Sequence, residues 1–117
     1  MPSESIECSF PGIDGATADV LAGDLVDSLE VDVPAATIER IRSDPLTQDF
    51  GATVLVILSA PAFVALASGV SKWLARRSDA SVHMHRTDSK GRERTVTVHG
   101  QIGRRADDLI REFLIDD

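Results

Sequence analysis

The sequence is poor in cysteine and in aromatic residues. Its 117 residues include one cysteine, Cys8, one tryptophan, Trp73, four phenylalanines and no tyrosine. A single cysteine excludes an internal disulfide, and so few rings leave little surface for stacking on nucleic-acid bases. The first residues hold acids where a secretory signal peptide has bases before an apolar stretch. These absences favour a cytoplasmic protein with a core of Ala, Val, Leu and Ile.

Motifs for nucleotide binding and for catalysis are also lacking. Gly100 and Gly103 make only part of a phosphate-loop pattern, and no Lys-Ser or Lys-Thr pair follows them. No carboxylate lies in an apolar stretch beside a partner suited to general acid and base work. The net charge of −7 disfavours a nucleic-acid partner. We therefore expect no enzymatic activity, no cofactor and no bound nucleic acid.

The charges that are present are distributed unevenly along the chain. Residues 1–71 hold 11 acids and 2 bases, whereas residues 72–117 hold 8 acids and 10 bases. Such an asymmetry suits the steering of a charged partner or the head-to-tail association of copies, although it is more often a solvated surface.

Apolar periodicity predicts one α+β domain over residues 1–117. Alternating residues indicate a strand at 5–10, and apolar residues at helical spacing indicate a helix over 15–30, with Asp14 as its N-cap. We interpret residues 35–42 as a second strand because they are rich in β-branched residues. An amphipathic helix that begins near residue 103 closes the chain.

The segment 81–99 predicts a β-hairpin. Two alternating runs flank a loop that contains Ser89, Lys90 and Gly91. If the apolar residues of both strands share the core face, Val82 lies opposite Val98 and Met84 opposite Val96. The last residue of a three-residue hairpin loop favours a left-handed backbone, where Gly91 is least strained.

The central residues 50–71 carry no charge, and the run is long enough to span a bilayer as a helix. A membrane-associated protein or pore former that inserts this segment is therefore the alternative function. Pro61 and the many small residues instead favour two buried pieces. The first, residues 53–58, could be helix or strand, and the second is a helix from about Pro61. The predicted order is strand, helix, strand, central apolar helical segment, hairpin and helix, with helices on one face of a sheet, and a ferredoxin-like relative is plausible.

Two surfaces are candidates for protein contacts. The second central piece carries small residues beside its large apolar stripe, and helix 15–30 carries acids off its apolar side. These candidate interaction residues are Ala62, Ala65, Gly69, Asp19, Asp24 and Asp27. A helix that is apolar nearly all round is either central in its domain or buried against another copy, so a homo-oligomer is possible. Candidate cleavage or contact loops contain Asp44, Pro45, Ser89, Lys90 and Gly91.

The three histidines fall on one face of the predicted hairpin. His83, His85 and His99 alternate with the apolar residues, so they lie opposite Val82 and Met84. Imidazoles can bind Zn²⁺, but a metal site also needs fixed geometry and further ligands. We interpret this face as a polar surface, a contact surface or a pH-sensitive patch, and we expect no metal site.

Two stretches resemble a known protein family. Residues 42–45 read Arg-Ser-Asp-Pro and 48–51 read Gln-Asp-Phe-Gly. The apolar run then leads into Lys-Trp-Leu-Ala-Arg-Arg at 72–77 and the glycine-turn hairpin. This order resembles the effector-associated constant component family, small accessory proteins of bacterial conflict and immunity systems that are often encoded beside caspase-like or trypsin-like peptidases and signalling ATPases.

The resemblance implies a component without its own enzymatic activity that couples a sensor or peptidase effector to its trigger. It carries over no catalytic residue. Together with the absence of a recognisable site, it predicts a protein-interaction adaptor or regulator of a bacterial defence system, a prediction that includes a peptidase substrate or inhibitor. The expected partner is a peptidase or a signalling ATPase.

Overall fold

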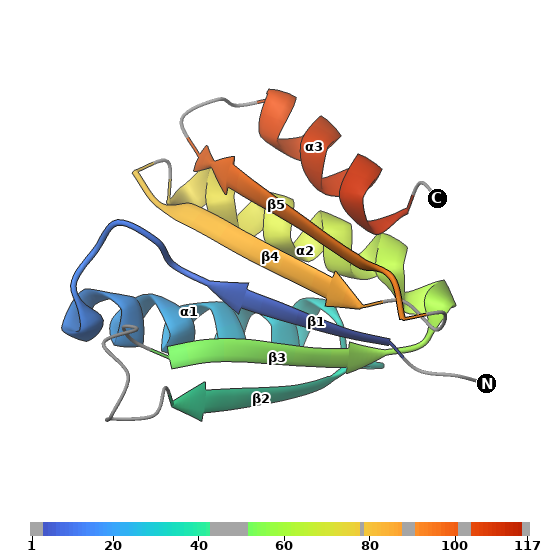
Figure 1. Ribbon diagram of the computed structural model, residues 1–117, viewed down its shortest axis with the longest axis horizontal. Coiled ribbons are helices and arrows are strands. Elements are labelled where there is room, and N and C mark those ends of the chain that lie inside the picture. The colour runs from blue at the N-terminus through green and yellow to red at the C-terminus, as the bar shows by residue number, and fades with distance from the viewer. Residues whose placement is uncertain (1–3, 43–51, 78, 88–90, 101–103, 116–117) are drawn as a thin grey trace.

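Five strands form one antiparallel sheet, and three α-helices pack on one of its faces, in the part of the chain that the computed structural model describes (Figure 1). The described residues are 4–42, 52–77, 79–87, 91–100 and 104–115. The elements are β1 (Glu4–Ser9), α1 (Gly15–Asp32), β2 (Thr37–Arg42), β3 (Ala52–Leu58), the 3₁₀ turn η1 (Ala60–Ala62), α2 (Phe63–Arg76), β4 (Ser81–Thr87), β5 (Glu93–His99) and α3 (Arg104–Leu114). The predicted α+β class is confirmed.

The strand order in the sheet is β2-β3-β1-β4-β5. The first piece of the central apolar run is therefore strand β3, which pairs with both β1 and β2. Its alternate residues Val54, Val56 and Leu58 are buried against the helices. The run is apolar on both faces, which is why its sequence did not distinguish a strand from a helix. Apart from η1, the first six elements run β-α-β-β-α-β, and a ferredoxin-like fold stays a prediction.

The hairpin register is the one that the alternation predicts. Val82 lies opposite Val98, and Met84 lies opposite Val96. Gly91 has φ of 79°, the left-handed conformation expected at the end of the loop. Ser89 and Lys90 lie outside the described residues, as do Asp44 and Pro45 of the other candidate loop.

Helix α1 begins as its sequence predicts. The side chain of Asp14 accepts a hydrogen bond from the backbone N–H of Thr17 at 2.6 Å, which is the N-cap geometry. This hydrogen bond lowers the pKa of the Asp14 carboxyl. The buried side of the helix consists of Ala18, Ala22, Leu25 and Leu29.

Helix α2 lies between α1 and α3 and forms the centre of the helical layer (Figure 1). Besides Gly69, its buried residues are Phe63, Leu66, Ala67, Val70, Trp73 and Leu74. The uncharged run 50–71 is thus divided between a strand and a helix. Within the described ranges, no helix has both the length and the apolar character needed to cross a membrane.

A buried arginine joins three parts of the fold. Arg86 of β4 is 7% exposed, and its Nη2 lies 3.1 Å from the Glu4 carboxylate of β1. Its Nη1 donates to the carbonyl oxygens of Phe113 and Leu114, both at 3.1 Å. The guanidinium also lies 4.6 Å from the ring centroid of Phe63. Arg86 therefore connects the sheet to the last turn of α3, whose carbonyls have no partner within the helix.

The thiol of Cys8 is fully buried on the core side of β1. Burial, with a smaller contribution from the charge of Glu7, raises its pKa from 9.0 to about 12. We expect the native protein to react with a thiol reagent far more slowly than the unfolded chain. Burial disfavours the thiolate form of Cys8. The stability that the buried neutral thiol gives the fold is therefore complete below about pH 9 and is lost as the pH rises toward 12. Equal thiol reaction rates in native buffer and in denaturant would contradict this assignment.

Candidate functional site

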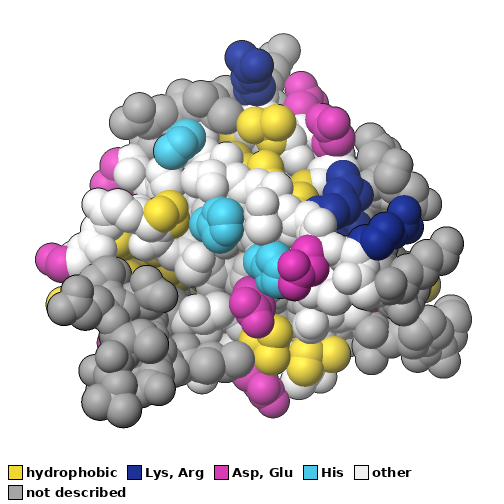
Figure 2. Space-filling model, viewed as in Figure 1, with side chains coloured by type: hydrophobic (Ala, Val, Ile, Leu, Met, Phe, Trp, Pro, Cys, Tyr) yellow, Lys and Arg dark blue, Asp and Glu magenta, His cyan; other side chains and the backbone are white. Residues whose placement is uncertain are grey.

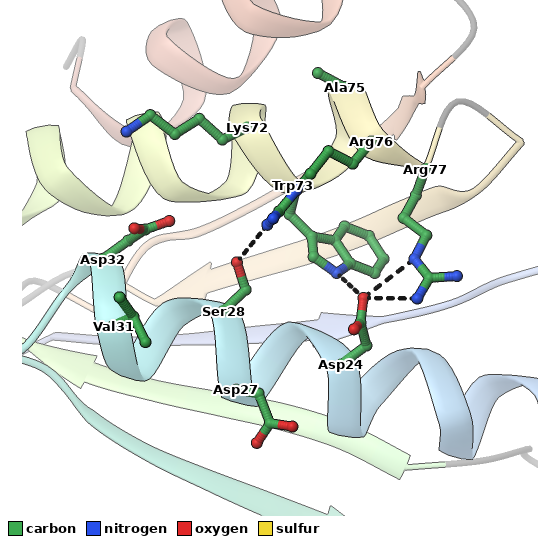
Figure 3. Close-up of a pocket in the computed structure, with 10 residues that line it drawn as sticks. All are labelled: Asp24, Asp27, Ser28, Val31, Asp32, Lys72, Trp73, Ala75, Arg76 and Arg77. Atoms are coloured by element: carbon green, nitrogen blue, oxygen red, sulfur yellow. Dashed lines mark hydrogen bonds and ion pairs between the residues drawn. The ribbon is translucent and has the colours of Figure 1, made fainter.

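An open groove with a volume of about 820 Å³ lies between α1 and the C-terminal half of α2 (Figure 3). Both walls are helical, so the site is presented on rigid elements. Its lining residues are Asp24, Asp27, Ser28, Val31, Asp32, Lys72, Trp73, Ala75, Arg76 and Arg77.

The two helices contact each other closely at Gly69. A Cβ atom at this position would lie 3.0 Å from Leu29 Cδ2 and 3.5 Å from Asp32 Cβ. Further along, Arg76 Nη2 donates to Ser28 Oγ at 3.0 Å, and Arg77, which follows the end of α2, donates to Asp24 through Nε at 3.1 Å. The helices therefore run antiparallel, and the absence of a side chain at Gly69 allows their close contact.

Asp24 closes one end of the groove. One of its carboxylate oxygens accepts a hydrogen bond from Trp73 Nε1 at 2.7 Å and one from Arg77 Nε at 3.1 Å (Figure 3). Arg77 Nη2 lies 3.0 Å from the same oxygen. The indole of Trp73 is 1% exposed and packs on Phe10, with ring centroids 5.8 Å apart. This charge-assisted network holds the helix pair and orients the Trp73 ring.

The remaining groove residues give the two walls opposite charges. Asp27 and Asp32 lie on α1, whereas Lys72 and Arg76 lie on α2. None of these four side chains forms an ion pair with another described residue. Val31, on the α1 wall, is 80% exposed. The groove thus combines an exposed aliphatic group with a negative wall and a positive wall, which is the chemistry of protein recognition rather than of a closed small-molecule pocket.

The predicted acidic surface of helix 15–30 is partly used inside the molecule. Asp19 forms an ion pair with Arg40 of β2, whose Nη2 also donates to the Asp19 carbonyl at 2.7 Å. Asp24 holds Trp73 and Arg77. Of the three predicted acids, only Asp27 is exposed and without such a partner among the described residues. The predicted contact role is corrected for Asp19 and Asp24, which bond within the chain, and it stays a prediction for Asp27.

The predicted stripe of small residues is corrected as well. Gly69 and Ala62 are buried, and Gly69 lies against Leu29, Asp32 and Val33. Ala65 is exposed on the outer side of α2. Ala62 and Gly69 therefore pack within the chain's own core, whereas Ala65 does not, so the three small residues do not form one surface for a partner.

The histidines lie on the sheet face opposite the helices, as the alternation predicts (Figure 2). His83 Nδ1 lies 2.8 Å from Thr97 Oγ1, and His99 Nδ1 lies 2.5 Å from Ser81 Oγ. His85 lies beside Glu7 and Glu93. No group of three or more potential ligands in the described part of the chain has the geometry to hold a metal ion.

Several groove residues were missed in the sequence. The missed residues are Val31 and Asp32 at the end of α1 and Lys72 in the C-terminal half of α2. They lie outside the apolar stripes on which the predictions depended. Val31 did leave a signal, because it is an aliphatic residue off the buried side of α1 and next to Asp32. Val20 and Val64 are exposed aliphatic residues too, so the position of Val31 beside the groove, and not its exposure alone, distinguishes it.

Comparisons with protein-family models, with curated proteins and with solved structures found no match.

Proposed function

We propose that this protein is a non-catalytic protein-interaction adaptor or regulator, and that its partner docks in the groove between α1 and α2. The proposal depends chiefly on Val31, which is 80% exposed beside the groove. An aliphatic side chain exposed to this degree gains free energy when a partner covers it. The two oppositely charged walls would then fix the orientation of that partner.

The chemistry of the groove specifies the kind of segment that fits. The partner segment carries an aliphatic side chain against Val31, a basic side chain toward Asp27 and Asp32, and an acidic side chain toward Lys72. A helix with this amphipathic pattern satisfies all three conditions at once. Because Trp73 and Asp24 already bond to each other, they form a rigid end wall and need no rearrangement on binding.

We further propose that the partner belongs to a bacterial defence system, as a peptidase or a signalling ATPase. This assignment is supported by the resemblance of residues 42–51 and 72–77 to the effector-associated constant component family. The second of these stretches includes Lys72, Trp73, Arg76 and Arg77, all of which line the groove. The resemblance and the candidate site therefore share the same residues.

Val31→Asp tests the groove directly. The substitution places a charge at an aliphatic contact and adds to the negative wall, so we expect binding of the partner to weaken by tenfold or more. The products of the genes adjacent to this one, purified individually, serve as candidate partners, and isothermal titration calorimetry measures their affinity. Lys72→Glu, which reverses the positive wall, should weaken the same complex.

Val64→Asp is the matched control for this experiment. Val64 is 55% exposed on α2, but it does not line the groove. The control should therefore bind like the unmodified protein, and circular dichroism should show that all three variants fold. Partner binding that survives both Val31→Asp and Lys72→Glu would reject the groove as the docking site.

A further inference from the structure

The sheet face that the helices leave open carries a pattern of charge distinct from that of the groove. The register places Ser5, Glu7 and Ser9 of β1 on this face, next to His83 and His85 of β4. Leu55 and Ile57 of β3 lie on the other side of β1 and are half-buried. Figure 2 shows the three histidine side chains in a row across this face, with acidic side chains beside one of them.

Glu7 and His85 are direct cross-strand neighbours on the open face. Glu7 Oε2 lies 3.9 Å from His85 Nδ1, and Glu93 Oε1 of β5 lies 3.5 Å from His85 Nε2. The side chains of Glu7, Glu93 and His85 are 54%, 68% and 30% exposed. On the adjacent strands, the described titratable groups of this face nearest to His85 are these two carboxylates and His83 of β4. An acid and an imidazole are thus presented side by side, and both are accessible.

We propose that this open face binds a second copy of the chain, in a dimer that forms as the pH falls. In a two-fold interface, residue i contacts residue j of the partner and j contacts i. A two-fold axis that runs parallel to the strands, between β1 and β4, exchanges these two strands. Since Glu7 and His85 share one row of the sheet, this axis places each Glu7 over the His85 of the other copy. The two Glu7–His85 contacts beside the axis are therefore equivalent and complementary in charge when His85 is protonated.

The size of the face is sufficient for a weak specific dimer. The same axis places β3 over β5 of the other copy, so four strands take part. Four strands of about seven residues, at roughly 3.3 Å per residue and about 4.8 Å apart, cover about 450 Å² of flat sheet. Side-chain relief raises the accessible area toward the roughly 600 Å² per partner found in the smaller specific interfaces. Leu55 and Ile57 supply aliphatic surface for this contact.

The sign of the pH dependence follows from the charges at the axis. With neutral imidazoles, two copies bring Glu7 and Glu93 together twice, and these four carboxylates repel one another. A histidine side chain carries a positive charge once it is protonated, which acidification favours. Each protonated His85 then attracts Glu7 of the other copy in addition to its own Glu7 and Glu93, so protonation favours the dimer. The net charge of −7 per chain also makes two copies repel each other. Protonation of the histidines reduces this repulsion, so it favours the dimer as well.

Sedimentation velocity on the untagged chain tests the proposal, over concentrations from about 5 to about 300 µM. We expect a dimer at about pH 6 whose dissociation constant is about tenfold higher at pH 8, because two partly exposed pairs contribute modestly. Glu7→Lys and His85→Glu should each abolish the dimer, since each places like charges opposite one another. An equimolar mixture of these two variants should restore it as a heterodimer with both contacts attractive.

Asp27→Asn is the control, because Asp27 lies in the groove and should leave the dimer unchanged. Circular dichroism establishes that the variants remain folded. A chain that sediments as a monomer at both pH values throughout this range would overturn the proposal. So would dimerisation of Glu7→Lys and His85→Glu with the affinity of the unmodified chain, since the interface would then lie elsewhere.

Discussion

Replacing Arg86 with methionine is expected to lower the free energy of unfolding by about 3 to 5 kcal/mol, the cost of removing one partner of a buried ion pair. Methionine keeps much of the side-chain volume, so the loss is mainly electrostatic. The Glu4 carboxylate, only 13% exposed, would remain without its cation. The carbonyl oxygens of Phe113 and Leu114 would lose their donor, which leaves the end of α3 unsatisfied.

Arg111→Met is the matched control for this experiment. Arg111 pairs with Asp107 one helical turn away on α3, and both side chains are about two-fifths exposed. Exposed pairs of this kind contribute about 0.3 to 0.5 kcal/mol. Urea denaturation followed by circular dichroism measures both variants. If Arg86→Met loses no more stability than Arg111→Met, Arg86 does not hold the sheet and α3 together.

Trp73→Ala is expected to lower the free energy of unfolding by about 3 to 5 kcal/mol, as for other fully buried aromatic residues. Truncation leaves a cavity under the groove and removes the contact with Phe10. It also removes the hydrogen bond to Asp24, which keeps Arg77 as its remaining partner. The same urea titration, followed by circular dichroism, measures the effect.

Two further variants separate the contributions of Trp73. Trp73→Phe keeps most of the ring volume but loses the Nε1 donor, so we expect a smaller loss of about 1 to 2 kcal/mol. Lys72→Ala changes the adjacent exposed position and should stay within about 0.5 kcal/mol of the unmodified protein. A loss for Trp73→Ala as small as that for Lys72→Ala would mean that the ring contributes little to the core.

The central apolar run shows where pattern reasoning reaches its limit. Residues 54–58 are apolar on both faces of β3, which lies inside the sheet between β1 and β2. A strand of this kind shows no alternation, and a short apolar helix has the same composition. The sequence located the break near Pro61 correctly, but only the pairing of β3 with two neighbours decided its structure.

The candidate groove was only partly predictable for a related reason. Asp24 was predicted as an acid off the apolar side of its helix, and Trp73 belongs to one of the stretches that carry the family resemblance. Their hydrogen bond joins positions 49 residues apart. Nothing local distinguishes Asp24, which has an internal partner, from Asp27, which remains exposed. The difference arises from the side on which α2 crosses α1.

The sequence by itself determined the elements whose geometry is local. The hairpin register, the left-handed Gly91, the Asp14 cap and the buried side of α1 all follow from backbone periods and turn chemistry within a few residues. Only the tertiary structure decided that Gly69 serves an internal helix contact, that Arg86 holds α3, and which charges remain free in the groove and on the open sheet face. Those outcomes depend on strand order and helix crossing, which bring together residues that no local period relates.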